Sequence, residues 1–171
     1  MRLDHFPHLE VDAPKAPPTA EEIAGIETAV GATLPPDLLD FLSAANGGKL
    51  DYTFELPTES RPFPLCFYSV YSTRLPYPGR SPAGLILHEL EVERRLKDLR
   101  PGLLPIGADG GTSVLYVDLA PERYGRIVAY VEGLPGWDGT PEGCFVDLAP
   151  TLAAYLSALY LNTVDESKRG G

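Results

Sequence analysis

The sequence predicts an α+β fold: a single domain with a mainly antiparallel sheet, packed by two N-terminal helices, a middle helix and a C-terminal helix. Apolar residues recur at helical spacing within residues 20–45, 85–99 and 152–160. Between residues 103 and 133 lie three β-favouring segments, separated by glycine or polar turns. These turns are too short for a parallel crossover, so we expect the three strands to pair antiparallel.

The first helix is predicted near Ala20 to Ala29. Thr19 and Glu22 have the spacing of a capping box, in which each side chain accepts a hydrogen bond from the other residue's backbone amide. Gly31 suits the left-handed position that follows a helix. The expected apolar face consists of Ile23, Ile26 and Val30.

The second helix is predicted near Pro36 to Ala45. Pro36 fits the first helical position because the N–H group that proline lacks would have no partner there. The sequence Asn46-Gly47-Gly48 is expected to end the helix. Its predicted apolar face consists of Leu38, Phe41, Leu42 and Ala45.

The middle of the chain predicts irregular structure followed by a third helix. Proline and aromatic residues are frequent from Asp51 to Pro82, where PLCFYSVYSTRL predicts one or two short strands. The segment from Leu85 to Leu99 predicts a helix with one solvated, charged side. Its expected apolar stripe consists of Leu85, Val92, Leu96 and Leu99.

Three strands and a closing helix complete the predicted domain. The strands are expected in Leu103 to Asp109, Thr112 to Leu119 and Gly125 to Gly133. The closing helix has its apolar stripe at Leu152, Tyr155, Leu156, Leu159 and Tyr160. We expect a flexible, proline-rich leader over residues 1–18, a domain over 19–161 and a polar tail over 162–171.

Composition limits the classes of function. The 171 residues contain no apolar run near the roughly 20 residues needed to cross a bilayer, which predicts a soluble protein without a membrane partner. Cys66 and Cys144 match no metal or redox spacing, so we expect reduced thiols and a cytoplasmic location. The net charge of −10 disfavours direct nucleic-acid binding and favours a cationic partner, although solubility alone also explains an acidic surface.

Several segments in order resemble one family. The chain resembles the SUKH superfamily of Smi/Knr-like proteins in four segments and in its closing helix. The segments are IETAVGATLPPDLLDFLSAANGG, LLPIGADGG, VLYVDL and GRIVAYVEG, and the helix contains Thr151, Leu152, Tyr155 and Leu156. The resemblance covers about residues 19–161 and implies an α+β fold with an antiparallel sheet packed by helices. It also implies a protein-binding function. Many bacterial members are immunity proteins that neutralise secreted toxin domains, often nucleases, whereas eukaryotic relatives are regulatory interaction modules.

The sequence offers little for catalysis. It contains no nucleophile elbow, phosphate-binding loop, dinucleotide fingerprint or zinc-protease helix, so we predict no catalytic, cofactor-binding or metal-binding residues. His5 and His8 could hold a metal with Asp4 only if the leader folded into a turn. His88 is interpreted as a helix-surface histidine and Cys66 as an inert, buried thiol.

Two glycine-rich connections carry the predicted partner-binding residues. The turn after the first predicted strand of the sheet borders a groove in the resembled family, but a plain strand-connecting turn is the favoured explanation. The loop from Leu134 to Gly143 holds the single tryptophan, which serves either as an interface anchor or as a cover for a sheet edge. The predicted partner-binding residues are Asp109, Gly110, Gly111, Glu132, Trp137, Asp138 and Glu142. A wider acidic surface was expected to include Asp118, Glu122 and Asp147.

The favoured hypothesis is a non-enzymatic bacterial immunity protein that neutralises a cationic toxin domain, such as a nuclease, by occlusion. The first alternative is a regulatory or scaffolding module with an endogenous protein partner. The second alternative is a small hydrolase or transferase.

Overall fold

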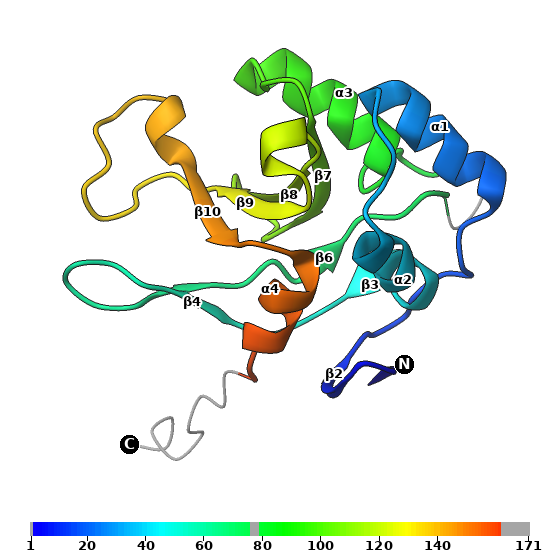
Figure 1. Cartoon of the computed structure of the whole chain (residues 1–171), viewed down its shortest axis with the longest axis horizontal. Helices are drawn as coiled ribbons and strands as arrows, with labels where there is room; N and C mark the ends of the chain where they lie inside the picture. The colour runs from blue at the N-terminus through cyan, green and yellow to red at the C-terminus, as the bar shows by residue number, and fades with distance from the viewer. Residues whose placement is uncertain (1, 76–78, 162–171) are drawn as a thin grey trace.

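A six-stranded antiparallel sheet forms the centre of the computed structural model, which describes residues 2–75 and 79–161 (Figure 1). The strand order is β10-β9-β8-β7-β6-β3. The predicted class is confirmed, because the helices pack around a mainly antiparallel sheet. The strands are β3 (Gly48–Lys49), β6 (Ser69–Val70), β7 (Leu103–Ala108), β8 (Val114–Asp118), β9 (Arg126–Tyr130) and β10 (Phe145–Ala149).

Helices cover both faces of this sheet. Every residue of β8 is buried, which is expected of a strand covered on both sides. The helix α3 (Ile86–Lys97) packs on β7, while α4 (Leu152–Ala158) packs on β9 and β10. In Figure 1, α1 (Ala20–Val30) lies beside α3, and α2 (Pro36–Ala44) lies on the same side as α4.

The two N-terminal helices form where the sequence predicts them. The Glu22 N–H donates to Thr19 Oγ1 at 3.2 Å and the Thr19 N–H to Glu22 Oε2 at 2.9 Å, which confirms the capping box. Gly31 has φ 71° and donates its N–H to the Glu27 carbonyl at 2.8 Å. The second helix ends one residue earlier than predicted, at Ala44, and the following Ala45 has φ −131°, outside the left-handed region.

The apolar stripe predicted for α3 is wrong in part, because Leu99 is buried but lies beyond the end of the helix. Leu96 is 69% exposed, and the buried residues of the helix are Ile86, Leu90 and Glu93. The Tyr116 hydroxyl donates to the Glu93 carboxylate, and Lys97 Nζ lies 2.7 Å from Glu93 Oε2. Glu93 can therefore be buried, which no apolar pattern would indicate. Burial and the adjacent Glu93 carboxylate raise the pKa of Tyr116, so its hydroxyl stays a donor.

Residues 2–15, within the predicted leader, contain regular structure. They form a hairpin of β1 (Arg2–Leu3) and β2 (Phe6–Glu10), and Leu9 and Val11 are fully buried. Beyond the hairpin, Asp12 exchanges two 2.9 Å backbone hydrogen bonds with Lys49. Burial of alternate apolar residues therefore fixes this segment against the domain. The predicted tail, residues 162–171, lies outside the described residues.

Gly48 makes this pairing possible. Its φ is +97°, and a Cβ built on it would lie 2.4 Å from the Asp12 carbonyl oxygen. The glycine pair after α2 therefore does more than end a helix, because it lets the N-terminal segment approach β3 closely.

Asn46 joins three segments beside this edge. Its Nδ2 donates to the Ala16 carbonyl at 2.8 Å and to Thr73 Oγ1 at 3.0 Å, and its Oδ1 accepts the Thr73 N–H at 2.8 Å. Asn46 is fully buried, so these bonds satisfy an amide that would otherwise be costly.

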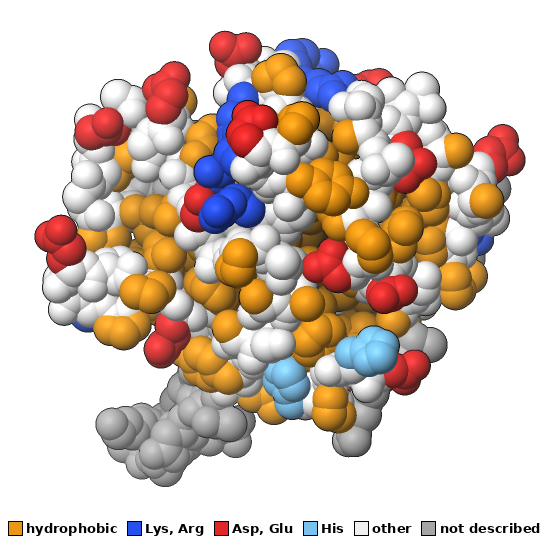
Figure 2. All heavy atoms as spheres, viewed as in Figure 1, with side chains coloured by type: hydrophobic (Ala, Val, Ile, Leu, Met, Phe, Trp, Pro, Cys, Tyr) orange, Lys and Arg blue, Asp and Glu red, His pale blue; other side chains and the backbone are white. Residues whose placement is uncertain are grey.

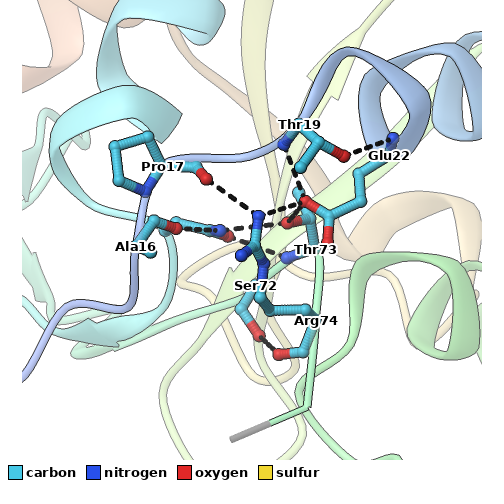
Figure 3. A network of polar contacts seen from close by, with 8 residues as sticks. Ala16, Pro17, Thr19, Glu22, Ser72, Thr73 and Arg74 are labelled. Atoms are coloured by element: carbon cyan, nitrogen blue, oxygen red, sulfur yellow. Dashed lines mark hydrogen bonds and ion pairs between the residues drawn. The ribbon is translucent and has the colours of Figure 1, made fainter.

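The same network ties α1 to the segment after β6 (Figure 3). Arg74 Nη2 donates to Glu22 Oε2 at 2.7 Å and to the Pro17 carbonyl at 2.8 Å. Thr73 Oγ1 donates to the same Glu22 oxygen at 2.9 Å. Glu22 therefore caps its own helix and also cross-links it to a distant part of the chain.

The proline-rich segment contributes a separate hairpin. Its strands are β4 (Phe54–Leu56) and β5 (Phe63–Leu65), and the hairpin projects from the body of the molecule (Figure 1). The prediction of one or two short strands between residues 64 and 75 corresponds to β5 and β6, whereas β4 was not predicted. Two short 3-10 helices complete the fold, η1 (Pro121–Arg123) and η2 (Glu142–Cys144).

Replacing Gly48 by Ala should destabilise the protein by about 2 kcal/mol or more, because alanine is strained at positive φ and its Cβ would overlap Asp12. Gly25→Ala is the matched control. Gly25 lies within α1 with nothing within 4 Å of a built Cβ, so alanine should stabilise by about 0.5–1 kcal/mol. Urea unfolding measures both, and equal effects would contradict the close approach at Gly48.

Glu22→Gln should cost about 1–2 kcal/mol at pH 7, because it removes the ion pair with Arg74. Burial raises the pKa of Glu22, but hydrogen bonds from Thr19, Arg74 and Thr73 outweigh this and hold it below its ordinary value of 4.5. The stabilisation is therefore complete above pH 4.5 and is lost as pH falls through the lowered pKa.

The measurement is denaturant unfolding of both proteins as a function of pH. The difference between wild type and Glu22→Gln should shrink below about pH 4. Glu21→Gln, an exposed neighbour with the same change in charge, should show little difference at any pH. A constant cost for Glu22→Gln down to pH 2 would show that ionisation of Glu22 does not contribute.

Candidate functional site

The two predicted connections lie at one end of the sheet. Val114, at the start of β8, pairs with Ala108 of β7 and with Tyr130 of β9, which pairs in turn with Phe145 of β10. Neighbouring strands are about 4.8 Å apart, so the β7–β8 turn and the β9–β10 loop begin about 10 Å from each other. The fold therefore brings all seven predicted residues to the same end.

The β7–β8 turn is held by its own carboxylate. Asp109 Oδ1 accepts the N–H groups of Gly111 at 2.7 Å and Ser113 at 3.2 Å. Gly110 has φ +84°, and a Cβ built there would lie 2.2 Å from the Tyr68 hydroxyl. Backbone geometry and the packing of Tyr68 therefore account for these residues, which favours the explanation of this segment as a plain turn.

The β9–β10 loop is also internally bonded, but it exposes its aromatic ring. Trp137 Nε1 donates to the Thr140 carbonyl at 2.7 Å, while 40% of the residue stays exposed. Asp138 Oδ1 accepts from Thr140 Oγ1 at 2.7 Å and Thr140 N at 2.9 Å, and these bonds lower the pKa of Asp138. Glu132 and Glu142 are exposed on the same loop. The indole is thus oriented without being covered.

A groove separates this loop from the β4–β5 hairpin. Its volume is about 640 Å³, within the range of roughly 300–1,000 Å³ typical of binding clefts. Figure 2 shows a hollow with hydrophobic side chains between two projecting parts of the surface, and in Figure 1 the loop and hairpin project to that side. The groove is lined by Leu56, Pro57, Thr58, Glu59, Ser60, Leu134, Pro135, Gly136 and Val146.

Sequence reasoning missed the hairpin wall of this groove. A signal was present, because Phe54-Glu55-Leu56 alternates in polarity before a polar turn. The two prolines in the second half obscured the pattern. The exposed charges on the hairpin are Glu55, Glu59 and Arg61, of which Glu55 accepts a 2.8 Å hydrogen bond from the Tyr160 hydroxyl.

Two acids expected on the acidic surface are paired with arginines, one of them inside the structure. Asp118 is fully buried, where it binds Arg100 at 2.6 Å and Arg123 Nε at 2.8 Å. Asp147 pairs with Arg123 and lies 3.7 Å from Arg126 Nη1. The expectation is therefore wrong for Asp118, which is buried, whereas Asp147 is exposed with its charge paired to arginine. Glu59 lines the groove, and Glu132, Asp138 and Glu142 remain as exposed acids on the loop that forms its other wall.

With this geometry established, comparison with known families is informative. Residues 17–158 match the SMI1 / KNR4 family (SUKH-1). The chain belongs to this family. Membership confirms the resemblance and supports, at family level, a module of the binding or immunity type. A search of curated proteins gave no match.

The SUKH-1 domain has a second hollow on another side. It has a volume of about 510 Å³ and lies between the β1–β2 turn, α2 and α4. Asp37 at its wall accepts the Ala153 N–H at 3.2 Å and so helps to cap α4. His5 also lines this hollow, with Asp4 and Asp40. No predicted partner-binding residue lines either hollow, but Leu134, Pro135 and Gly136 of the groove directly precede Trp137 in the β9–β10 loop, so the groove is the better candidate site.

Reactive groups in this SUKH-1 domain are dispersed. Within residues 2–75 and 79–161, no three His, Cys, Asp or Glu residues are grouped so that they could hold a metal ion. Cys66 is half-buried and not fully buried as expected; burial and the nearby Asp51 raise the pKa of its thiol. His88 is half-buried on α3. In the same part of the chain, no helix has the length and apolar character to span a bilayer.

Proposed function

We propose that this chain is an immunity-type binding protein that neutralises a cationic toxin domain by covering it. The observation that carries the proposal is the groove beside Trp137, in a SUKH-1 domain of net charge −10. The proposed partner-binding residues are Asp109, Gly110, Gly111, Glu132, Trp137, Asp138 and Glu142, of which the four from the β9–β10 loop provide the charge and the anchor.

Two physical contributions would act in this complex. Exposed acids on the groove's rim attract a basic surface over a distance of about 8–10 Å at physiological salt, which speeds encounter. Trp137 then contributes at short range, because a partly exposed indole that becomes buried on binding is a frequent energetic anchor. No cofactor or covalent step is required.

The β9–β10 loop is suited to this role because it is already ordered. Trp137 Nε1 donates to the Thr140 carbonyl and Asp138 Oδ1 accepts the Thr140 N–H, so the indole and the carboxylate are held in place before a partner arrives. A preorganised loop loses less conformational entropy on binding than a flexible one, so more of the contact energy contributes to affinity.

The alternative of a regulatory module with an endogenous partner uses the same surface. A partner recovered from the native host distinguishes them, because an immunity protein should bind a toxin domain whose activity it abolishes. Binding to a housekeeping protein without inhibition would support the regulatory alternative.

Asp138→Asn with Glu142→Gln should slow association with the captured partner about 3- to 10-fold at low salt and change dissociation little, because rim charges act before contact. The asparagine oxygen still accepts the Thr140 bonds, so the loop should keep its shape. Surface plasmon resonance at several salt concentrations measures both rates. The matched control is Glu21→Gln with Glu91→Gln, which changes the net charge equally on α1 and α3, away from the groove.

Trp137→Ala should speed dissociation about 30-fold, the equivalent of about 2 kcal/mol. Its melting temperature should change by less than about 4 °C, because the ring is bonded only at the loop surface. Leu96→Ala, which truncates an exposed apolar residue on α3, should leave the rates unchanged. An acidic partner, or one insensitive to salt and to all these changes, would contradict the proposal.

A further inference from the structure

The sheet has one covered edge and one open edge. At the β3 edge, Asp12 pairs with Lys49 through two backbone hydrogen bonds of 2.9 Å. At the opposite edge, in the part of the chain that the structure describes, β10 pairs only with β9. An open edge strand can bind a further strand from another chain, and proteins usually protect such edges.

The register shows which backbone groups face the open side. The Val131 N–H donates to the Cys144 carbonyl at 2.8 Å, and Val146 pairs with Ala129. In an antiparallel ladder the intervening residues, Phe145 and Asp147, must then direct their backbone groups away from β9. The Phe145 N–H is bonded to the Glu142 carbonyl, at the end of η2.

Three backbone groups remain at this edge. Within residues 2–75 and 79–161, no backbone partner is found for the Phe145 carbonyl or for the N–H and carbonyl of Asp147. A bulge between Asp147 and Ala149, followed by Pro150, interrupts regular pairing beyond this point. A strand could therefore be added only along the first half of β10, which is the half next to the groove, because Val146 lines it.

We propose that Phe145 to Asp147 is a strand-addition site, where an extended segment carrying Lys or Arg side chains pairs with β10 and extends along the groove. This inference rests on the proposed function, since it specifies how the same surface holds the same partner. Alternate side chains of the added segment would lie over the apolar groove residues and beside the acidic loops.

Charge identifies the occupant. The exposed charges on the two walls are Glu55, Glu59, Glu132, Asp138 and Glu142 against Arg61. Beside the site itself, Arg123 and Arg126 are paired with Asp147, so the unpaired charge around the groove is acidic and a basic segment is complementary. A second copy of this chain is disfavoured, because pairing two β10 edges would bring identical acidic loops together in chains of net charge −10.

The test uses a synthetic peptide of alternating Lys and Val as the probe. Amide exchange is followed by NMR on the full chain at low ionic strength. Without peptide, the Asp147 N–H should exchange faster than the Val146 N–H, which faces β9. With peptide, exchange at Asp147 should slow at least about tenfold, the effect of forming one backbone hydrogen bond. The same peptide with alternate backbone nitrogens methylated should bind at least about tenfold more weakly.

Two variants separate the backbone from the side chain. Asp147→Pro removes the outward N–H without removing a hydrogen bond to β9. Edge strands tolerate proline at positions whose N–H faces away from the neighbouring strand. Asp147→Ala loses the same carboxylate but keeps the N–H. The affinity for the probe should fall at least about tenfold more in Asp147→Pro than in Asp147→Ala. If Asp147→Pro does not fold, the methylated peptide and the exchange rates still decide.

Equal binding of both peptides, no protection of Asp147, or no binding of the probe would overturn the inference. Protection of the Asp147 N–H in the free protein would also overturn it in two cases. Protection that increases with protein concentration would indicate that a second copy binds there, and protection that disappears when residues 162–171 are deleted would indicate that this segment binds there. The proposed function is tested separately. A captured partner that responds to Trp137→Ala but not to Asp147→Pro would leave that function standing while this binding mode fails.

Discussion

Two backbone hydrogen bonds between Asp12 and Lys49 close one edge of the central sheet, and the arrangement of the rest depends on this closure. The pairing requires a residue without a Cβ at position 48, because the Asp12 carbonyl occupies that space. Once the N-terminal segment lies there, Asn46 can bond to Ala16 and Thr73, and Arg74 can reach Glu22. The closed edge is thus fixed by a polar network, while the open edge at β10 lies beside the two loops that border the groove.

Carboxylates in this protein fall into two groups with different physical roles. Glu93, Asp118 and Glu22 are buried or partly buried and bonded to tyrosine, lysine or arginine, so they hold elements together. The acids around the groove have no arginine or lysine ion partner within residues 2–75 and 79–161, and their field extends into solvent. Net charge alone does not distinguish these groups. Their positions do, and they place uncompensated negative charge beside the loop that exposes Trp137.

The sequence predicted the structure correctly where residues close together in the chain determine it. The capping box at Thr19, the left-handed Gly31 and the short turns between β7, β8 and β9 follow from adjacent residues, and all were predicted. Prediction failed where distant residues decide. Burial of Glu93 depends on Tyr116, and the ordering of residues 2–15 depends on Gly48. The predicted loop residues do lie at one end of the sheet, but the opposite wall of the groove comes from a hairpin 70 to 80 residues earlier in the chain, whose prolines concealed its strands.

The central claim is that the partner binds between the β4–β5 hairpin and the β9–β10 loop. Hydrogen exchange with mass spectrometry, on the full chain with and without its captured partner, tests this most directly. The account predicts that protection concentrates in residues 55–61 and 132–147. Protection confined to residues 3–6 and 37–44, around the second hollow, or to the outer faces of α1 and α3, would contradict it.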